Sequence, residues 1–255
     1  MGKIIAVAGK GGTGKTTLTG LLIDYLTKSG KTPVLAVDAD ANSNLNEVLG
    51  VKVESTIGEI REEVNQREMV PDGFPGGMTK AQYLQYRLNT GILEGDGYDL
   101  FVMGRSEGKG CYCFVNGILR EQLDKISDKY HYVVIDNEAG MEHLSRGTTR
   151  NIDVLILISD CSRRGIQAVG RIHKLVAELG LKVNEQHLII NRAPEGDLSE
   201  GISEEISLQG LELLGIIPLD PLIYEYDSQG KALVNLPDNS ISKRTFKDIC
   251  QQICL

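Results

Sequence analysis

The sequence lacks several features that would direct it to a membrane or to nucleic acid. No stretch is long and apolar enough to span a bilayer, and the N-terminal apolar run is too short for a signal peptide. Lys and Arg form no stripe, and 27 basic residues against 35 acidic ones leave a net charge of −8. Because nucleic acids and anionic membranes attract basic surfaces, we expect neither as a partner.

Repeats, low-complexity tracts and linkers are also missing, so we expect a single cytoplasmic domain over residues 1–255. The apolar content of 41% is ordinary for a globular chain with a substantial core. Five cysteines in a cytoplasmic protein favour free thiols or metal ligands over a disulfide framework.

The clearest motif is the segment 9–16, GKGGTGKT, which fits the pattern G-x-x-x-x-G-K-[ST] of a triphosphate-binding loop. It follows the apolar run 4–8 and precedes leucines at helical spacing, so it joins a predicted strand to a predicted helix. Lys15 is expected to reach the β- and γ-phosphates of ATP or ADP, and the Thr16 hydroxyl to hold Mg²⁺. The predicted nucleotide-binding residues of this segment are Gly11, Gly12, Thr13, Gly14, Lys15, Thr16 and Thr17.

The same glycines also satisfy a dinucleotide fingerprint, with Asp38 at about the spacing of a ribose-binding acid. A dinucleotide loop, however, has no use for a Lys15–Thr16 pair directed at a terminal phosphate and its metal. The triphosphate interpretation is therefore favoured.

Apolar segments alternate with helical patterns along the chain, and several are continuously apolar, as in strands buried on both faces. The sequence thus predicts an α/β P-loop NTPase fold, with a mostly parallel sheet of seven or eight strands and helices on both faces. The predicted strands are 3–8, 33–37, 99–103, 131–135, 153–158, 186–190 and 213–217. Residues 54–98 interrupt this rhythm and read as a functional insertion with short helices around 56–68 and 79–88.

Acidic residues follow two of the predicted strands. Asp38 and Asp40 come directly after the strand 33–37, and Asp136 follows the strand 131–135. Because ligands bind at the carboxyl ends of parallel strands, one acid can position water while Asp38 and Asp136 act on Mg²⁺ through its water shell. From spacing alone, Asp38 and Asp40 could instead be helix-capping or solvated residues.

Two thiols, Cys111 and Cys113, flank one tyrosine in a glycine-bordered segment. They can converge on one soft metal ion, and a two-fold dimer would supply four sulfurs for Zn²⁺ or Ni²⁺. By spacing alone they could equally be incidental cysteines.

The loop with its early Lys10 resembles the deviant Walker A motif of ATPases such as nitrogenase iron protein and the Min and Par proteins. The resemblance implies a homodimer formed around ATP, with Lys10 acting across it and Asp40 orienting the hydrolytic water. The segments 136–148 and 159–165 resemble the CooC-type ATPases. That family implies a metal site at Cys111 and Cys113 and a role in nickel insertion into carbon monoxide dehydrogenase or acetyl-CoA synthase.

The resembled class also binds adenine near two strand ends, which places Asn191, Arg192 and Pro218 among the expected nucleotide-binding residues. Two other functions stay open: a nucleotide-gated iron–sulfur electron carrier, and a regulatory ATP switch that binds no metal.

Overall fold

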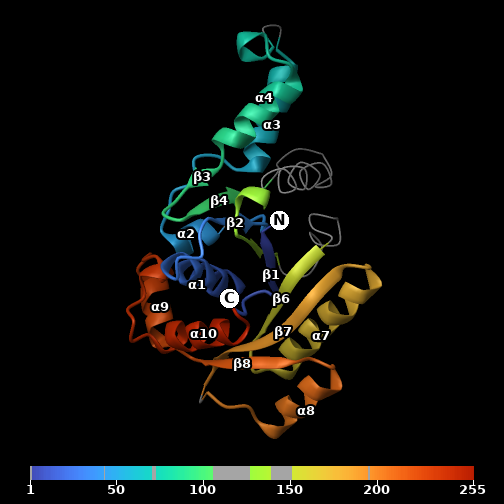
Figure 1. The fold of residues 1–255 in the computed structure, drawn as a ribbon, viewed down its shortest axis with the longest axis vertical. Helices are drawn as coiled ribbons and strands as arrows, with labels where there is room; N and C mark the ends of the chain where they lie inside the picture. The colour runs from blue at the N-terminus through green and yellow to red at the C-terminus, as the bar shows by residue number, and fades with distance from the viewer. Residues whose placement is uncertain (1, 43, 71–72, 106–126, 139–150, 195) are drawn as a thin grey trace.

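The computed structural model describes residues 2–42, 44–70, 73–105, 127–138, 151–194 and 196–255. Within them lies an eight-stranded sheet of order β3-β4-β2-β5-β1-β6-β7-β8 (Figure 1). The strands are β1 (Lys3–Gly9), β2 (Val34–Asp38), β3 (Leu93–Glu94), β4 (Tyr98–Val102), β5 (Tyr132–Asp136), β6 (Asn151–Ser159), β7 (Lys182–Ala193) and β8 (Leu213–Pro218). All neighbours pair in parallel except β3, which pairs with β4 in the antiparallel sense.

The described helices are α1 (Lys15–Lys28), α2 (Leu45–Leu49), α3 (Ile57–Glu68), α4 (Lys80–Thr90), α7 (Arg163–Glu178), α8 (Glu200–Leu208), α9 (Pro221–Ser228) and α10 (Ile241–Gln252). Single turns of 3₁₀ helix occur at η1 (Pro75–Gly77), η2 (Ser127–Lys129) and η3 (Leu233–Asn235). The seven predicted strands and both helices of the predicted insertion are confirmed, within a few residues at their ends. The two-residue strand β3 was not predicted.

Two hydrophobic layers cover the sheet, because alternate residues of each strand point to opposite faces. On one face, Ile5 and Val7 of β1 pack with Leu22 and Leu26 of α1 and with Phe246 of α10. The opposite face is covered in two parts: α7 and α8 pack over β6 and β7, whereas α3 and α4 pack over the ends of β2, β4 and β5. Helices therefore lie on both faces, as predicted.

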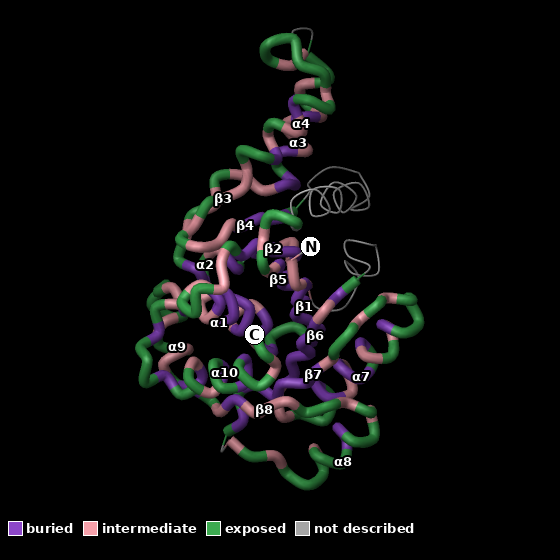
Figure 2. Tube along the Cα trace, viewed as in Figure 1, coloured by how far each residue is buried: buried purple, intermediate pink, exposed green. Residues whose placement is uncertain are grey.

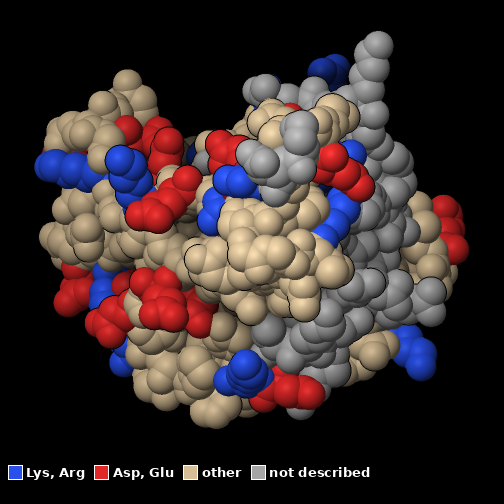
Figure 3. Space-filling model, turned by 90° about the horizontal axis from the view of Figure 1, so that it is seen from above, with Lys and Arg blue, Asp and Glu red and all other residues tan. Residues whose placement is uncertain are grey.

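Helices α3 and α4 form a hairpin that projects from the body along its longest axis (Figure 1). A capping box starts each helix, at Thr56 with Glu59 and at Thr79 with Gln82. Burial is confined to one side of the hairpin and is greatest near the sheet, while the far end is exposed (Figure 2). Seen from above, this end is largely uncharged at its centre, with charged side chains around it (Figure 3).

Candidate functional site

The site forms where β1 turns into α1. Gly14 caps α1 with φ of 92°, and Gly12 also has a positive φ of 79°, a backbone conformation that glycine adopts without Cβ strain. The Thr13 hydroxyl donates to the Lys10 carbonyl at 2.9 Å, and Lys15 Nζ donates to the same oxygen at 3.4 Å. The segment thus closes into a compact loop at the N-terminus of α1, where backbone amides and the helix dipole favour an anion.

Lys10 and Lys15 occupy opposite environments within this loop. Lys10 is exposed, whereas Lys15 is only 7% exposed. Burial lowers the pKa of Lys15, although the neighbouring carboxylates Asp136, Asp40 and Glu138 act to raise it. One lysine is therefore enclosed among acids, and the other is available at the surface.

Asp136 ends β5 directly beside the loop and is 1% exposed. Its Oδ1 accepts from the Thr19 hydroxyl at 3.3 Å, while its Oδ2 is buried and has no hydrogen-bond partner among the residues that the structure describes. Burial raises the pKa of Asp136 to about 6, against the lowering effects of the Thr16 hydroxyl and Lys15. A buried carboxylate oxygen without a donor, next to Thr16, suits the shell of a hard divalent cation.

Asp38 lies opposite Asp136 in the parallel pairing of β2 with β5 and is fully buried. Its two oxygens accept from the backbone amides of Asp40, at 3.1 Å, and Leu45, at 3.0 Å. Burial raises the pKa of Asp38 to about 7, and the nearby charge of Asp136 raises it as well. Asp38 therefore organises the loop that carries Asp40, while Asp136 retains the free oxygen.

Asn191 and Arg192, at the end of β7, contact the loop from its other side. Asn191 is buried, and its Nδ2 donates to the Thr13 carbonyl at 2.8 Å. Arg192 donates from its guanidinium to the Gly12 carbonyl at 3.0 Å. Pro218 lies beside them, because it pairs with Ala193 across the β7–β8 ladder.

A cavity of about 830 Å³ opens at the first residues of α1 and is large enough for part of a nucleotide. It is lined by Thr16 and Thr17, by the end of α2 with Lys52, and by the α9–η3 segment with Asp227 and Lys231. Neither Asn191 nor Pro218 lines this cavity.

The structure therefore brings the loop 9–16, Asp38, Asp136 and Asn191 to one edge of the sheet. The predicted metal ligands Cys111 and Cys113 lie outside the described residues. Thr19 was not predicted, although it lies one helical turn after Thr16 and so shares its face of α1.

None of the described helices is long and apolar enough to cross a membrane. No group of three or more His, Cys, Asp or Glu side chains within the described ranges is arranged to hold a metal ion.

Comparison with known proteins agrees with this geometry. Residues 4–234 match the CobQ/CobB/MinD/ParA nucleotide binding domain. An uncharacterized ATP-binding protein of Methanocaldococcus jannaschii is 46% identical over 98% of each chain. The carbon monoxide dehydrogenase accessory protein CooC of Rhodospirillum rubrum is 31% identical, covering 91% of this chain and 89% of its own. Among solved structures, the cell division ATPase MinD of Pyrococcus furiosus has a TM-score of 0.71 and 24% identity, covering 99% of this chain and 98% of its own.

Proposed function

The chain belongs to the CobQ/CobB/MinD/ParA family of nucleotide-binding domains, and on this premise we propose that it is a Mg²⁺-dependent ATPase that dimerises around ATP and delivers nickel to a client enzyme. The observation that carries the ATPase is the enclosed Asp136, whose free oxygen lies beside the phosphate-binding loop and its buried Lys15. The proposed clients are carbon monoxide dehydrogenase and acetyl-CoA synthase.

The residues divide the work of ATP binding and hydrolysis by their environments. Lys15 and the loop amides bind the β- and γ-phosphates, and Thr16 and Asp136 hold Mg²⁺, with Asp38 fixing the neighbouring loop. Bound Mg²⁺ neutralises charge that develops on the phosphate oxygens. Asp40, half-exposed at the mouth of the site, orients the attacking water. The exposed Lys10 reaches a phosphate in the partner subunit.

The base belongs at the ends of β7 and β8 in this proposal. Asn191 gives one amide hydrogen to Thr13 and retains a second, so it can still donate to adenine while Pro218 borders the ring.

The nickel part of the proposal depends on a different line of support. The accessory protein CooC of Rhodospirillum rubrum is similar over nearly the whole chain, and its name ties it to carbon monoxide dehydrogenase. This sequence also carries Cys111 and Cys113, a pair of soft ligands that a two-fold dimer doubles to four. Nickel is cargo here, bound between subunits and released when ATP hydrolysis changes the dimer.

Anaerobic calorimetry with Ni²⁺ and with Zn²⁺, paired with mass determination in ADP and in ATP, tests this function. We expect one metal ion per dimer, lost in a Cys111→Ser/Cys113→Ser variant that still binds ATP. Cys254→Ser is the matched control, because Cys254 is an exposed free thiol and should leave the stoichiometry unchanged.

The other outcomes select between the remaining functions. ATP-driven dimerisation without metal binding would leave a regulatory switch and remove the delivery role. A brown protein with iron and sulfide bound would instead indicate the electron carrier.

A further inference from the structure

Two hydrogen bonds fasten the end of β7 to the phosphate-binding loop. Arg192 donates to the Gly12 carbonyl at 3.0 Å, and Asn191 donates to the Thr13 carbonyl at 2.8 Å. The contact is close, because a Cβ added to Gly14 would lie 2.4 Å from Asn191 Nδ2. Two consecutive peptide groups of the loop are therefore held by two consecutive side chains of one strand.

These bonds fix the direction of the loop amides. A trans peptide is planar, and its carbonyl and the following N–H point in opposite directions. With the Gly12 and Thr13 carbonyls turned toward β7, the amides of Thr13 and Gly14 point away from it, toward the hollow of the loop. Within the described part of the chain, neither amide donates to a protein backbone acceptor outside regular helices and strands. No described backbone acceptor therefore competes with an anion for these two amides.

The end of β7 is shaped for this contact. One extra residue in β7 separates its pairings of Ile190 with Ile216 and of Ala193 with Pro218. Arg192 lies in this bulge with φ of 60°, a left-handed conformation unusual for a residue other than glycine. Bulges redirect side chains, and the Arg192 amide donates to Asn191 Oδ1 at 3.0 Å, which fixes the asparagine as well.

We propose that Arg192 is a positioning residue for triphosphate binding: it holds the Gly12 carbonyl so that the loop amides face the phosphates, and it recognises no base. This role rests on ATP binding at the loop, which is part of the proposed function. The neighbouring Asn191 contacts both the loop and, in the proposed function, the base, whereas Arg192 acts on the phosphate-binding loop alone.

Competition binding with three probes tests the role: ATP, GTP and inorganic tripolyphosphate, which has no base. Arg192→Met removes the donors and keeps the length of the side chain, while Arg192→Lys keeps one donor and the charge. Arg164→Met is the matched control, since Arg164 is an exposed arginine in the first turn of α7. Thermal unfolding of each variant without ligand checks that the fold is retained.

We expect Arg192→Met to weaken binding of all three probes by about the same factor, on the order of tenfold, or about 1.4 kcal/mol. Arg192→Lys should recover most of the loss, Arg164→Met should lose nothing, and the effect should persist at high salt, where diffuse charge interactions are screened.

Three results would overturn the role. A loss for ATP with unchanged tripolyphosphate binding would make Arg192 a base contact. A loss of affinity that disappears at high salt and is reproduced by Arg164→Met would show that Arg192 acts only through the net charge of the protein. Equal binding by wild type and Arg192→Met would show that Arg192 has no role in triphosphate binding. If the wild type bound none of the probes, the ATPase itself would be withdrawn.

Discussion

Two carboxylates, Asp136 in the sheet and Glu63 in the projecting hairpin, differ in how completely the surrounding side chains satisfy them. Asp136 is 1% exposed, and one of its oxygens has no hydrogen-bond partner within the described ranges. The Glu63 side chain is 31% exposed, and both of its oxygens are engaged. The difference lies in the donors around each group.

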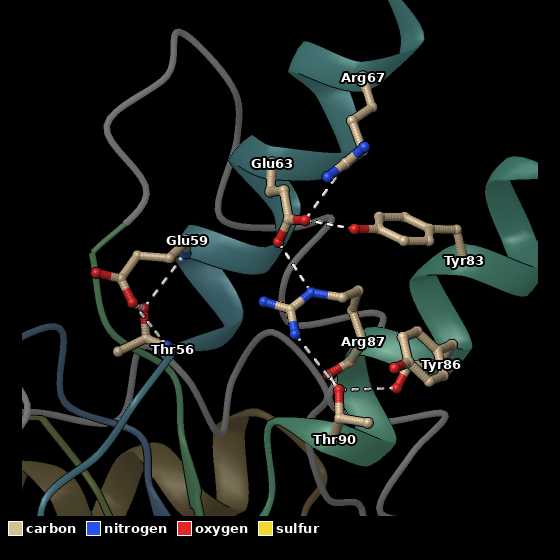
Figure 4. A network of polar contacts seen from close by, with 8 residues as sticks. All are labelled: Thr56, Glu59, Glu63, Arg67, Tyr83, Tyr86, Arg87 and Thr90. Carbon is tan, nitrogen blue, oxygen red and sulfur yellow. Dashed lines mark hydrogen bonds and ion pairs between the residues drawn. The ribbon is translucent and has the colours of Figure 1, made fainter. Parts of the chain in front are cut away.

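Glu63 is the hub of the hairpin (Figure 4). It accepts from Arg67 of its own helix at 3.3 Å, and from Arg87 at 2.9 Å and the Tyr83 hydroxyl across the hairpin. Burial acts to raise the pKa of Glu63, but the hydrogen bonds from Tyr83 and Arg87 prevail and lower it. Arg67 also lies over the Tyr83 ring, 5.2 Å from its centroid. Glu63 is satisfied within the protein and needs no ligand.

Asp136 is in the opposite condition. Burial dominates, and its pKa is raised to about 6. The uncompensated oxygen destabilises the free protein, and a cation relieves that cost on binding. A satisfied carboxylate such as Glu63 thus braces the hairpin, whereas an unsatisfied buried one such as Asp136 is a candidate for binding a cation.

The strongest test of this contrast is at the two loop lysines. Lys15→Ala should weaken ATP binding by about 100-fold or more, because a buried cation forms charge-assisted hydrogen bonds worth roughly 1.5–3 kcal/mol each. The Lys15→Ala variant should still fold without ligand, since the substitution removes a buried charge. Lys10→Ala should bind ATP within a few-fold of wild type and lose ATP-dependent dimerisation. Calorimetry with Mg-ATP measures the affinity, and mass determination measures dimerisation. Equal losses of ATP affinity in the two variants would contradict the assignment of the buried Lys15 to the subunit's own ATP and of the exposed Lys10 to the partner's.

The second test is the pH dependence of stability. The folded-state pKa of Asp136, about 6, lies above its ordinary value of 3.8, so between these pH values the folded protein holds a proton that the unfolded chain has lost. The free energy of unfolding therefore falls as the pH rises through this window. Asp136→Asn removes this penalty and should stabilise the ligand-free protein by about 2–3 kcal/mol near pH 8, with little gain near pH 4.

Urea unfolding without ligand, at several pH values, measures this effect. Asp38, whose pKa is raised to about 7, should leave some pH dependence in the variant. Asp40→Asn is the control, because Asp40 is half-exposed, and it should change stability by less than about 0.5 kcal/mol. The same variant of Asp136 should lose Mg²⁺-dependent hydrolysis. A variant less stable than wild type at every pH would show that Asp136 is structural.

Much of this arrangement follows from local sequence pattern. The apolar segments predicted seven strands, and the loop 9–16 with the strand-end acids Asp38 and Asp136 predicted one edge of the sheet as the site. These features depend on residues close together in the chain, and a parallel sheet then brings the strand ends together. The hairpin helices were predictable for the same reason.

The contacts across the sheet were not predictable in this way. The hydrogen bonds of Asn191 and Arg192 to the loop join residues 178 and 180 positions apart. They also depend on a β-bulge in β7 that no sequence pattern predicts. The strand β3 has two residues, too few for a periodic signal. In the sequence only the i,i+4 spacing to Arg67 distinguishes Glu63 from Glu62 and Glu59, because its other two donors, Tyr83 and Arg87, come from the facing helix.

The third test is at Glu63, where the expected effect is confined to the hairpin. Glu63→Gln should loosen the hairpin by about 1–3 kcal/mol, because the amide must turn a donor toward Tyr83 or Arg87. Acid should act in the same direction: the pKa of Glu63 is lowered from 4.5, so its stabilisation is complete above that value and is lost as the pH falls through the folded-state pKa. Hydrogen exchange of the α3 and α4 amides measures the loss, and ATP affinity should not change.

Glu68→Gln in the same hairpin tests whether the effect of Glu63 comes from its partial burial or only from its being paired with a cation. Glu68 forms an ion pair with Lys80, but both side chains are well exposed, at 56% and 41%. Exposed pairs contribute about 0–1 kcal/mol, so hydrogen exchange should barely respond. If Glu68→Gln loosened the hairpin as much as Glu63→Gln, the stability of the hairpin would depend on how many ion pairs it has and not on their burial. If only Glu63→Gln did, the brace would depend on a partly enclosed carboxylate with all its donors present.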